Sequence, residues 1–401
     1  MVKRPLRLLW VMPYLPWPTT SGGKLRQYHL LRCLAARGHR ITLLVQSKTA
    51  LDAETAARLE PLLEKLVVLP RRPLRSARTL WHGLVSPLPL LATVNGHAPA
   101  LSQQLEQLLE EDWDVIQVEH SYTYQPCRGP LRRRRAPLVL TEHNVESQLA
   151  AVTYARLPWP LRSLAGHDRR RYRRWERKVL GEADHVVAMT ADDARVFAAM
   201  AASPVAVVVN GSDTGALAAV QPDLHAARAL FVGNFEYAPN VDAVQWLLDE
   251  VMPRAWAQAP RLRIALCGHA LPPQWAQHWR DPRIDWIGYV PELAVEQARS
   301  SLFVAPLRDG GGSKLKVIEA MAAGLPLVAT AQAVSGLAVS DGVHCRLAAD
   351  AEGLARAMVE LQADPAQAAR LAVAARGYVC EQHDWQRSAD QLEAVYAGVC
   401  G

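Results

Sequence analysis

Short apolar runs alternate with stretches of helical periodicity along most of the chain. In the first half, β-branched and aliphatic runs predict strands at Arg7–Met12, Ile41–Gln46, Leu66–Leu69, Val115–Val118, Leu138–Thr141 and His185–Met189. In the second half, they predict strands at Leu230–Val232, Arg263–Cys267, Ile284–Ile287, Leu302–Ala305 and Leu327–Ala329. Helical patterns lie between them, including Lys24–Arg37, Ser102–Glu111, Val241–Gln258, Lys314–Ala323 and Glu352–Leu361. This alternation predicts parallel sheets with helices on both faces.

Two such series predict an α/β fold with two doubly wound, Rossmann-like domains. We expect the first domain at residues 1–205 and the second at residues 206–383, with a joint near Ser203–Arg228 that is rich in Pro, Gly, Asn and Asp. A last helix in residues 384–401 can complete either domain, and it can cross back to the first. Ligands of such sheets bind beyond the carboxyl ends of the strands, so the cleft between two facing domains is the expected site.

The composition narrows the class of protein. No run of about 18 apolar residues occurs, so no membrane span is expected. The six cysteines lie far apart without a CxxC pair, which argues against a disulfide framework and a zinc site and fits a reducing cytoplasm. Residues 1–200 hold 30 Lys and Arg against 18 Asp and Glu, a net charge of +12, whereas the remainder has −6. A basic first half suggests an anionic neighbour.

Three groups of candidate residues follow predicted strands of the first half. Gly22-Gly23 opens a helix whose free amides suit an anion, although a plain glycine turn explains the pair equally well. Glu119-His120 and Glu142-His143-Asn144 each come directly after a strand, and His143 is the stronger candidate. The Asp112-Trp113-Asp114 triplet precedes a strand, so we interpret it as a solvated turn and not as a metal site.

The segment Leu161–Leu180 predicts a strongly basic helix. Its apolar positions are Leu161, Leu164, Tyr172, Trp175, Val179 and Leu180. Such a helix suits an anionic membrane surface, and a solvated helix face is the plainer alternative. No recognisable nucleic-acid module accompanies it.

The second half carries glycines at the same predicted sheet edge. Gly233-Asn234, Gly268 and Gly288-Tyr289 each follow a strand. The segment "LRDGGGSKLKVIEAMAA" at Leu307–Ala323 then combines flexible backbone with charge. Amides of Gly310–Gly312 can approach a ligand closely, and the start of the following helix favours anions.

Charged side chains of this segment suit the two halves of a nucleotide. Arg308, Lys314 and Lys316 can neutralise a diphosphate, and Glu319 can accept hydrogen bonds from a ribose diol. An ordinary glycine turn before a surface helix is the alternative. Neither GxGxxG nor GxxxxGK[ST] occurs, which argues against dehydrogenases and P-loop enzymes.

With "GGGSKLKVIEAMAAGLPLVAT", "VGNFEYAPNVDAV" and "PYLPWPTTSGGKLRQYHLLRCLAARGH", the chain resembles the family-four retaining glycosyltransferases, of the bacterial polysaccharide type. The resemblance implies a GT-B fold of two facing Rossmann-like domains. It implies that Gly22 and Gly23 contact phosphate or sugar, that His143 bonds a sugar hydroxyl and that Glu319 holds the ribose. It further implies donor contacts from Gly311, Gly312, Ser313, Gly268 and Gly288–Val290, and an interdomain place for Asn210.

Two positions depart from the family pattern. Gly311 stands where the family often has a first glutamate. Gly233-Asn234-Phe235-Glu236 stands where many members carry an Arg and a Lys for the diphosphate. We therefore expect Arg308, Lys314 or Lys316 to take over the neutralisation of that charge.

The expected function is transfer of a sugar from a nucleotide-diphosphate sugar to an acceptor hydroxyl, a hexosyltransferase type of reaction, with His143, Glu319 and Lys316 as catalytic candidates. We expect no metal and no other cofactor, a saccharide or lipid-linked acceptor, an anionic membrane surface and no nucleic acid as partners, and a cytoplasmic, peripheral location at the inner face of the plasma membrane. Three alternatives stay open: a nucleotide-sugar epimerase of the same fold, a non-catalytic sugar-nucleotide binder and a basic nucleic-acid binder.

Overall fold

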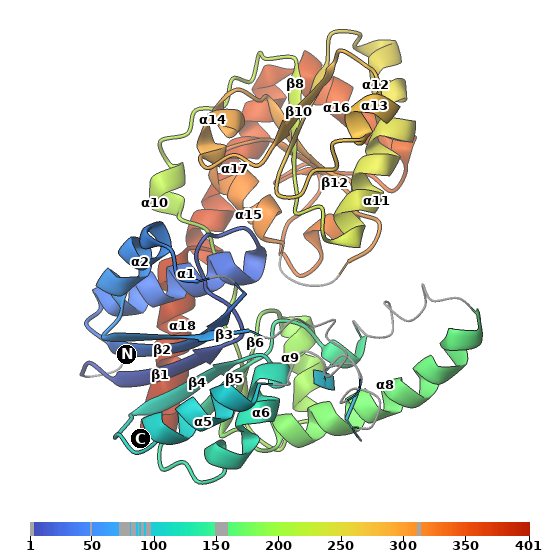
Figure 1. Ribbon diagram of the computed structural model, residues 1–401. Helices are drawn as coiled ribbons and strands as arrows, with labels where there is room; N and C mark the ends of the chain where they lie inside the picture. The colour runs from blue at the N-terminus through green and yellow to red at the C-terminus, as the bar shows by residue number, and fades with distance from the viewer. Residues whose placement is uncertain are drawn as a thin grey trace. The chain divides into compact units, whose positions relative to one another are not determined.

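A computed structural model describes residues 4–48, 50–71, 81, 86, 88–89, 92–93, 98–148, 159–310 and 314–401. The chain forms two compact units (Figure 1). The first consists of Met1–Val209 together with Ser388–Gly401, and the second of Asn210–Arg387. Each unit is a parallel sheet between layers of helices, which confirms the predicted α/β class.

The first unit has a seven-stranded sheet in the order β3-β2-β1-β4-β5-β6-β7, and every pairing in it is parallel. The strands are β1 (Arg7–Met12), β2 (Arg40–Ser47), β3 (Lys65–Pro70), β4 (Val115–Glu119), β5 (Leu138–Thr141), β6 (His185–Ala188) and β7 (Val205–Val207). In the interior strand β1, Leu9 pairs with Thr42 of β2 on one side and with Ile116 of β4 on the other. Because β1 is buried on both faces, it is apolar almost throughout.

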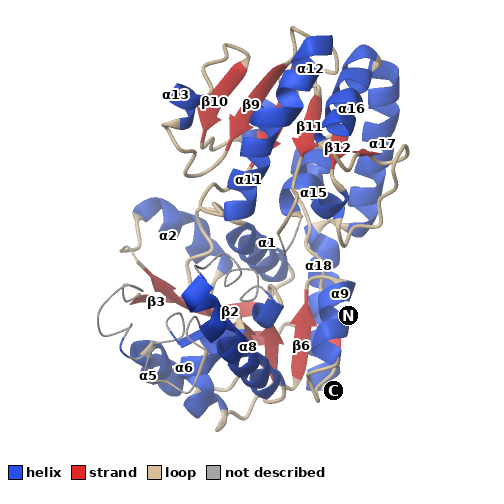
Figure 2. Ribbon diagram, turned by 90° about the vertical axis from the view of Figure 1, so that its right-hand side faces the viewer, coloured by secondary structure: helices blue, strands red, loops and turns tan. Residues whose placement is uncertain are grey.

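Helices cover both faces of this sheet (Figure 2). In the described residues, they are α1 (Gly22–Ala36), α2 (Ala53–Leu59), the short η1 (Glu60–Leu62), α5 (Pro99–Leu108), α6 (Ser121–Leu131), α8 (Trp159–Leu180), α9 (Ala191–Ala198) and α18 (Trp385–Cys400). The core on one face joins Leu9 and Val11 of β1 to side chains from α5, α6, α8 and α9.

The last helix, α18, is divided between the two units. Residues 385–387 count with the second unit, and residues 388–401 with the first. In the first unit, the hydroxyl of Tyr396 donates to Gln117 of β4 at 3.2 Å, and Glu393 accepts from Arg37 at 2.7 Å. The chain thus passes between the units at two points, 209–210 and 387–388.

The second unit has a six-stranded parallel sheet in the order β10-β9-β8-β11-β12-β13. The strands are β8 (Arg228–Val232), β9 (Arg263–Cys267), β10 (Ile284–Gly288), β11 (Leu302–Ala305), β12 (Leu327–Ala329) and β13 (Arg346–Leu347). The helices are α10 (Thr214–Leu217), α11 (Ala238–Trp246), η2 (Leu247–Val251), α12 (Met252–Gln258), α13 (Trp275–His278), α14 (Leu293–Ala298), α15 (Leu315–Ala322), η3 (Ala331–Val334), α16 (Ala351–Ala363) and α17 (Pro365–Gln382).

The predicted strands are all present, with ends shifted by at most two residues. Two strands were not predicted: β7 lies inside the expected joint, and β13 has only two residues. The helix predicted at Val241–Gln258 is interrupted by the π-helical turn η2 just before Pro253. Proline cannot donate the backbone hydrogen bond that a continuous helix needs there.

Candidate functional site

In the first unit, the loop after β1 leads to the start of α1 at Gly22, as predicted. Ser21 occupies the capping position, but its side chain makes no capping hydrogen bond. A side-chain carbon on Gly23 would lie 2.5 Å from the hydroxyl of Tyr14 and 3.6 Å from Nδ1 of His143. Only glycine therefore lets the start of α1 come this close to His143 without moving Tyr14.

His143, directly after β5, is held by a buried hydrogen-bond network. Its Nε2 lies 2.8 Å from the carboxylate of Glu119, the last residue of β4. Gln27 of α1 donates to the same carboxylate oxygen at 2.5 Å, and Gln117 donates to the other at 2.9 Å. An ionised Glu119 accepts the proton on Nε2, so His143 presents Nδ1, the nitrogen facing Gly23, as a hydrogen-bond acceptor.

His120, directly after β4, supports the ring of His143. The two imidazoles stack with centroids 3.9 Å apart, and Tyr122 stacks on the other face of His120 at 4.7 Å. Nε2 of His120 lies 3.1 Å from the hydroxyl of Tyr14. His120 also has a φ of 67°, a conformation that is uncommon outside glycine and that clusters at functional sites.

Burial keeps both histidines neutral. It lowers the pKa of His143 well below its ordinary value, and the field of Arg26 lowers it further. Burial and the neighbouring His143 likewise lower the pKa of His120. Burial raises the pKa of Glu119, against the field of Arg26 and the amide donors. The arrangement can accept a hydrogen bond from a hydroxyl, which fits the predicted role of His143 beside a sugar.

In the second unit, three glycines mark the carboxyl ends of β8, β9 and β10. Gly268 has a φ of 139°, and a side-chain carbon there would lie 1.7 Å from the carbonyl oxygen of Gly233. The amide of Gly268 donates to Gly288 at 2.7 Å, and that of Gly233 donates to Cys267 at 3.0 Å. The sheet edge is therefore built of closely packed backbone, as the pattern of glycines predicts.

Lys316 of α15 points to the same strand end. Its Nζ bonds the side-chain oxygen of Asn240, whose amide donates to the carbonyl of Asn234 at 2.8 Å. The ammonium also lies 4.8 Å from the centroid of the Phe231 ring. Asn240 thus ties Lys316 of one helix to the loop after β8.

The charged groups of α15 are strongly perturbed. Burial, together with the field of nearby Lys314, lowers the pKa of Lys316 to about 7. Burial alone raises the pKa of Glu319 to about 7. Although residues three apart on a helix are neighbours, no ion pair between Lys316 and Glu319 occurs within the described chain. A half-buried cation and a half-buried carboxylate thus lie three positions apart on the helix without an ion pair between them.

The other predicted cations already have partners. Arg308 forms a bidentate ion pair with Asp242, with distances of 2.7 and 3.1 Å, and lies over the ring of Trp246. This pairing raises the pKa of Arg308 and compensates its charge. Lys314 occupies the capping position of α15, so the helix begins later than expected, and its Nζ donates to the carbonyl of Gly310 at 3.3 Å. Of the three, Lys316 is therefore the best placed to meet a diphosphate.

Several predicted site residues lie elsewhere or outside the description. Gly311, Gly312 and Ser313 lie outside the described residues. Tyr289 is exposed and meets His269 edge to face. Asn210 is buried at the start of the second unit, where its carbonyl lies 2.8 Å from Nδ1 of His383.

Two further predictions concern the charged surface of the first unit. Asp114 of the acidic triplet accepts from the backbone of Arg7 at 2.8 Å, at the amino end of the sheet, so its role is structural. Among the described side chains of α8, the apolar residues Tyr172, Trp175, Val179 and Leu180 belong to the core, whereas Leu161 and Leu164 lie outside the described side chains. The described part of α8 thus offers a basic surface and not an apolar face for insertion into a membrane.

Sequence reasoning missed the residues that hold His143 and Lys316 in place. Gln27 acts on His143 through Glu119, which was a candidate, Tyr14 acts on His120, and Asn240 acts on Lys316. The available signal was spacing: Gln27 follows Gly23 by one helical turn, and Asn240 lies near the start of the helix after β8.

Comparisons with known proteins cover both units. The family model described as "Glycosyltransferase Family 4" matches residues 21–216, and "Glycosyl transferases group 1" matches residues 226–364. Glycogen synthase of Mycobacterium tuberculosis is 26% identical over 98% of this chain and 94% of its own length. Sucrose-phosphate synthase from Thermosynechococcus elongatus matches with a TM-score of 0.71 at 19% identity, covering 98% of each chain. HepE from Anabaena, in complex with UDP and glucose, matches with a TM-score of 0.69 at 16% identity, covering 98% of this chain and 100% of that chain.

Proposed function

Since this chain is a glycosyltransferase with the GT-B fold, we propose that it transfers a sugar from a nucleoside-diphosphate sugar to an acceptor hydroxyl, with retention of configuration. The observation that carries the proposal is the unneutralised pair on α15, Lys316 and Glu319, at the glycine-lined end of β8, β9 and β10. A diphosphate would provide a negatively charged partner for Lys316. A ribose diol would donate hydrogen bonds to the carboxylate of Glu319.

The chemistry follows from where charge builds up during transfer. As the glycosidic bond to the diphosphate breaks, negative charge grows on the departing phosphate oxygens. Lys316, fixed by Asn240 before the reaction begins, stabilises that charge without reorganisation. The proposal assigns this task to side-chain and backbone groups, so it requires no metal ion at the diphosphate. His143 accepts a hydrogen bond from the transferred sugar through Nδ1.

A screen of nucleoside diphosphates and their sugar conjugates by thermal unfolding tests the proposal. A ligand at 100 times its Kd stabilises the folded protein by about 2.7 kcal/mol, and the best conjugate is then supplied with lipid and oligosaccharide acceptors. We expect stabilisation by one nucleoside diphosphate, weak or absent in Lys316→Met, and a glycosylated product by mass spectrometry. An epimerised sugar formed without acceptor, or no stabilisation at millimolar concentrations, would contradict it.

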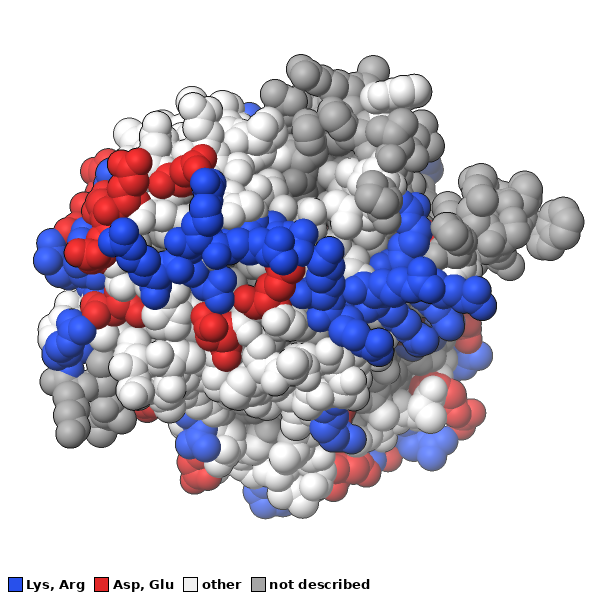
Figure 3. Space-filling model, turned by 90° about the horizontal axis from the view of Figure 1, so that it is seen from below, with Lys and Arg blue, Asp and Glu red and all other residues white. Residues whose placement is uncertain are grey.

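We further propose that the acceptor is a polysaccharide or glycolipid precursor and that the protein works at an anionic membrane surface. Among the described residues, no helix is long and apolar enough to cross a bilayer. Lys and Arg gather in a band on one face (Figure 3). Exposed cations of the first unit include Arg132, Arg133 and Arg135 before β5, and Arg169, Arg170, Arg173, Arg174, Arg177 and Lys178 on α8.

Because the exposed side chains described on α8 are basic and its described apolar side chains lie in the core, attachment would be electrostatic. Each basic residue near an anionic surface contributes about 1 kcal/mol, and salt screens it. We expect flotation with phosphatidylserine vesicles at low salt, loss of binding at high salt, and reduced flotation when Arg170, Arg173 and Arg174 are replaced by Gln. Equal flotation with neutral vesicles would contradict this part of the proposal.

A further inference from the structure

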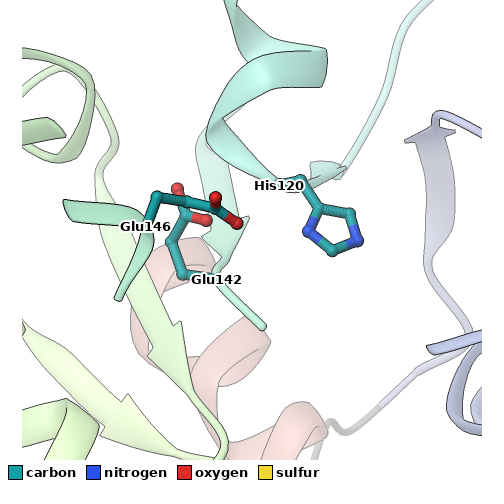
Figure 4. Close-up of side chains that lie close together, drawn as sticks. All are labelled: His120, Glu142 and Glu146. Atoms are coloured by element: carbon teal, nitrogen blue, oxygen red, sulfur yellow. The ribbon is translucent and has the colours of Figure 1, made fainter. Parts of the chain in front are cut away.

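A histidine and two glutamates of the first unit converge beside the strand ends of β4 and β5. His120 follows β4, Glu142 follows β5, and Glu146 comes four residues after Glu142 in the sequence. One potential ligand atom from each lies within 4.8 Å of the others, and Figure 4 shows both carboxyl groups on the side of the imidazole that carries one ring nitrogen. These donors come from two loops that are brought together only by the parallel pairing of β4 with β5.

Within the described chain, these groups lack the partners that buried polar atoms normally have. Glu142 is fully buried, and neither of its carboxylate oxygens makes a hydrogen bond. Burial raises the pKa of Glu142 well above its ordinary value, and Glu146 and Glu176 raise it further, while the hydroxyl of nearby Ser121 does not reach hydrogen-bonding geometry. Nδ1 of His120 is also buried without a partner, while its Nε2 meets Tyr14. Buried polar atoms without partners are costly and rare, so they point to a missing ligand.

A third carboxylate, Glu176 of α8, supports this arrangement from behind. One of its oxygens accepts from the backbone amide of Glu146 at 2.9 Å, and the other makes no hydrogen bond in the described structure. No ion pair in the described residues reaches Glu142, Glu146 or Glu176, although the field of Arg173 acts on Glu176. The missing ligand should therefore carry positive charge.

We propose that His120, Glu142 and Glu146 bind a divalent transition-metal ion such as Zn²⁺. Imidazole combined with carboxylates favours such ions over Mg²⁺ and Ca²⁺, which prefer oxygen ligands alone. Ligand atoms about 2.1 Å from a common tetrahedral ion are about 3.4 Å apart, so these side chains need to close by up to about 1.4 Å. Glu176 then acts as a positioning residue that fixes the backbone of Glu146.

This ion would lie within the first unit and has a role separate from the diphosphate. It neutralises two buried carboxylates and fixes the His120 ring that stacks on His143. The inference does not rest on the proposed transfer reaction, because metal binding is measured without any donor. A protein without metal affinity and one without transfer activity are distinguishable results.

The direct test uses the full chain, without an affinity tag, after dialysis against a chelator. Calorimetric titration with Zn²⁺ is expected to show a tight site, and the unfolding temperature is expected to rise with bound ion. Diffraction from Zn²⁺-soaked crystals at the zinc absorption edge should place an anomalous peak between His120 and the two glutamates. The absence of a peak there, or a peak only at other residues, overturns the proposal.

Variants separate this site from other zinc-binding side chains. Glu146→Gln keeps the shape but loses a ligand charge, and we expect its Zn²⁺ affinity to fall by at least about tenfold. His185→Gln is the matched control, because His185 has a buried nitrogen without a partner but is not part of the cluster. Equal affinity of Glu146→Gln and the wild type, or an equal loss in His185→Gln, contradicts the assignment. If Glu146→Gln does not fold, the anomalous peak of the wild type decides.

Discussion

The two units have similar sheet edges but differ in how the charged side chains at these edges are paired. In the first unit, Glu119, Gln27 and His143 satisfy one another through short hydrogen bonds, and His143 is neutral. In the second unit, Lys316 and Glu319 lie three positions apart on α15 and do not pair. The polar side chains of the first edge therefore have their partners before a ligand binds, whereas Lys316 and Glu319 of the second edge have no oppositely charged partner among the described residues.

This difference indicates which part of a substrate each edge meets. Burying a charge without an opposite charge is expensive, and the protein moves the pKa values of Lys316 and Glu319 toward 7 as a result. A diphosphate and a ribose diol would remove that cost on binding. The neutral, preorganised edge with His143 suits the uncharged hydroxyls of a sugar.

Replacing Lys316 should give the largest effect. If it did not, the contrast between the two sheet edges would not hold. For Lys316→Met we expect kcat/KM to fall by roughly 100- to 1,000-fold, because an electrostatic donor to the departing diphosphate is lost. Arg308→Gln is the matched control, since Arg308 is already paired with Asp242, and its loss should be much smaller. Steady-state kinetics of both variants, with folding checked by circular dichroism, decides. Equal losses of kcat/KM would indicate that both Lys316 and Arg308 bind the diphosphate.

Glycine-to-alanine variants compare the backbones of the two edges. Gly268→Ala forces a carbon against the carbonyl of Gly233 at positive φ, so the free energy of unfolding should fall by about 3 kcal/mol. Gly23→Ala meets the hydroxyl end of the Tyr14 side chain and no backbone atom, so the loss should be about 1 kcal/mol. Urea denaturation measures both. A larger loss for Gly23→Ala would show that the first edge is the more rigid one.

Removing the carboxylate that positions His143 sharpens the comparison further. Glu119→Gln replaces a charge-assisted hydrogen bond with a neutral one, and we expect kcat to fall by roughly 10- to 100-fold. Affinity for the nucleoside diphosphate, measured by calorimetry, should not change, because that ligand is assigned to the second unit. A parallel loss of nucleotide affinity would show that His143 acts on the diphosphate.

A further expected effect is a pH dependence of stability that comes from Glu319. Its pKa is about 7 in the folded protein and near 4.5 when unfolded, so the folded state keeps a proton that the unfolded state has released between these values. This group therefore lowers the free energy of unfolding as pH rises from 4.5 to 7. Glu319→Gln should match the wild type below pH 4.5 and exceed its stability increasingly up to pH 7. Parallel unfolding temperatures across this range would show that Glu319 is not desolvated.

The strands could be predicted because both sheets are parallel and buried on two faces. Such strands are continuous apolar runs, as in Leu302–Ala305, and they stand out against helical periodicity. The two missed strands, β7 and β13, are short and only half-buried, unlike the equally short but fully buried β12. The π-helical turn before Pro253 depends on tertiary packing as well as on the proline, and no residue count reveals it.

The site could be predicted only as far as local chemistry reaches. Glycines and charges directly after strands mark the two edges, as at Gly268 and Lys316. Pairings between distant segments are invisible in one sequence: Arg308 meets Asp242 across 66 positions, and Gln27 meets Glu119 across 92. Such pairings decide whether a cationic side chain is available to a ligand or already has its charge compensated.

The shared helix α18 has a consequence for synthesis and for fragments. Tyr396 and Leu392 are buried in the first unit, although they follow the whole second unit in the sequence. The first sheet therefore cannot complete its covering until the second unit and residues 388–401 have been synthesised. A fragment ending at Val209 should consequently be soluble only if the final fourteen residues are supplied in trans or grafted on by circular permutation.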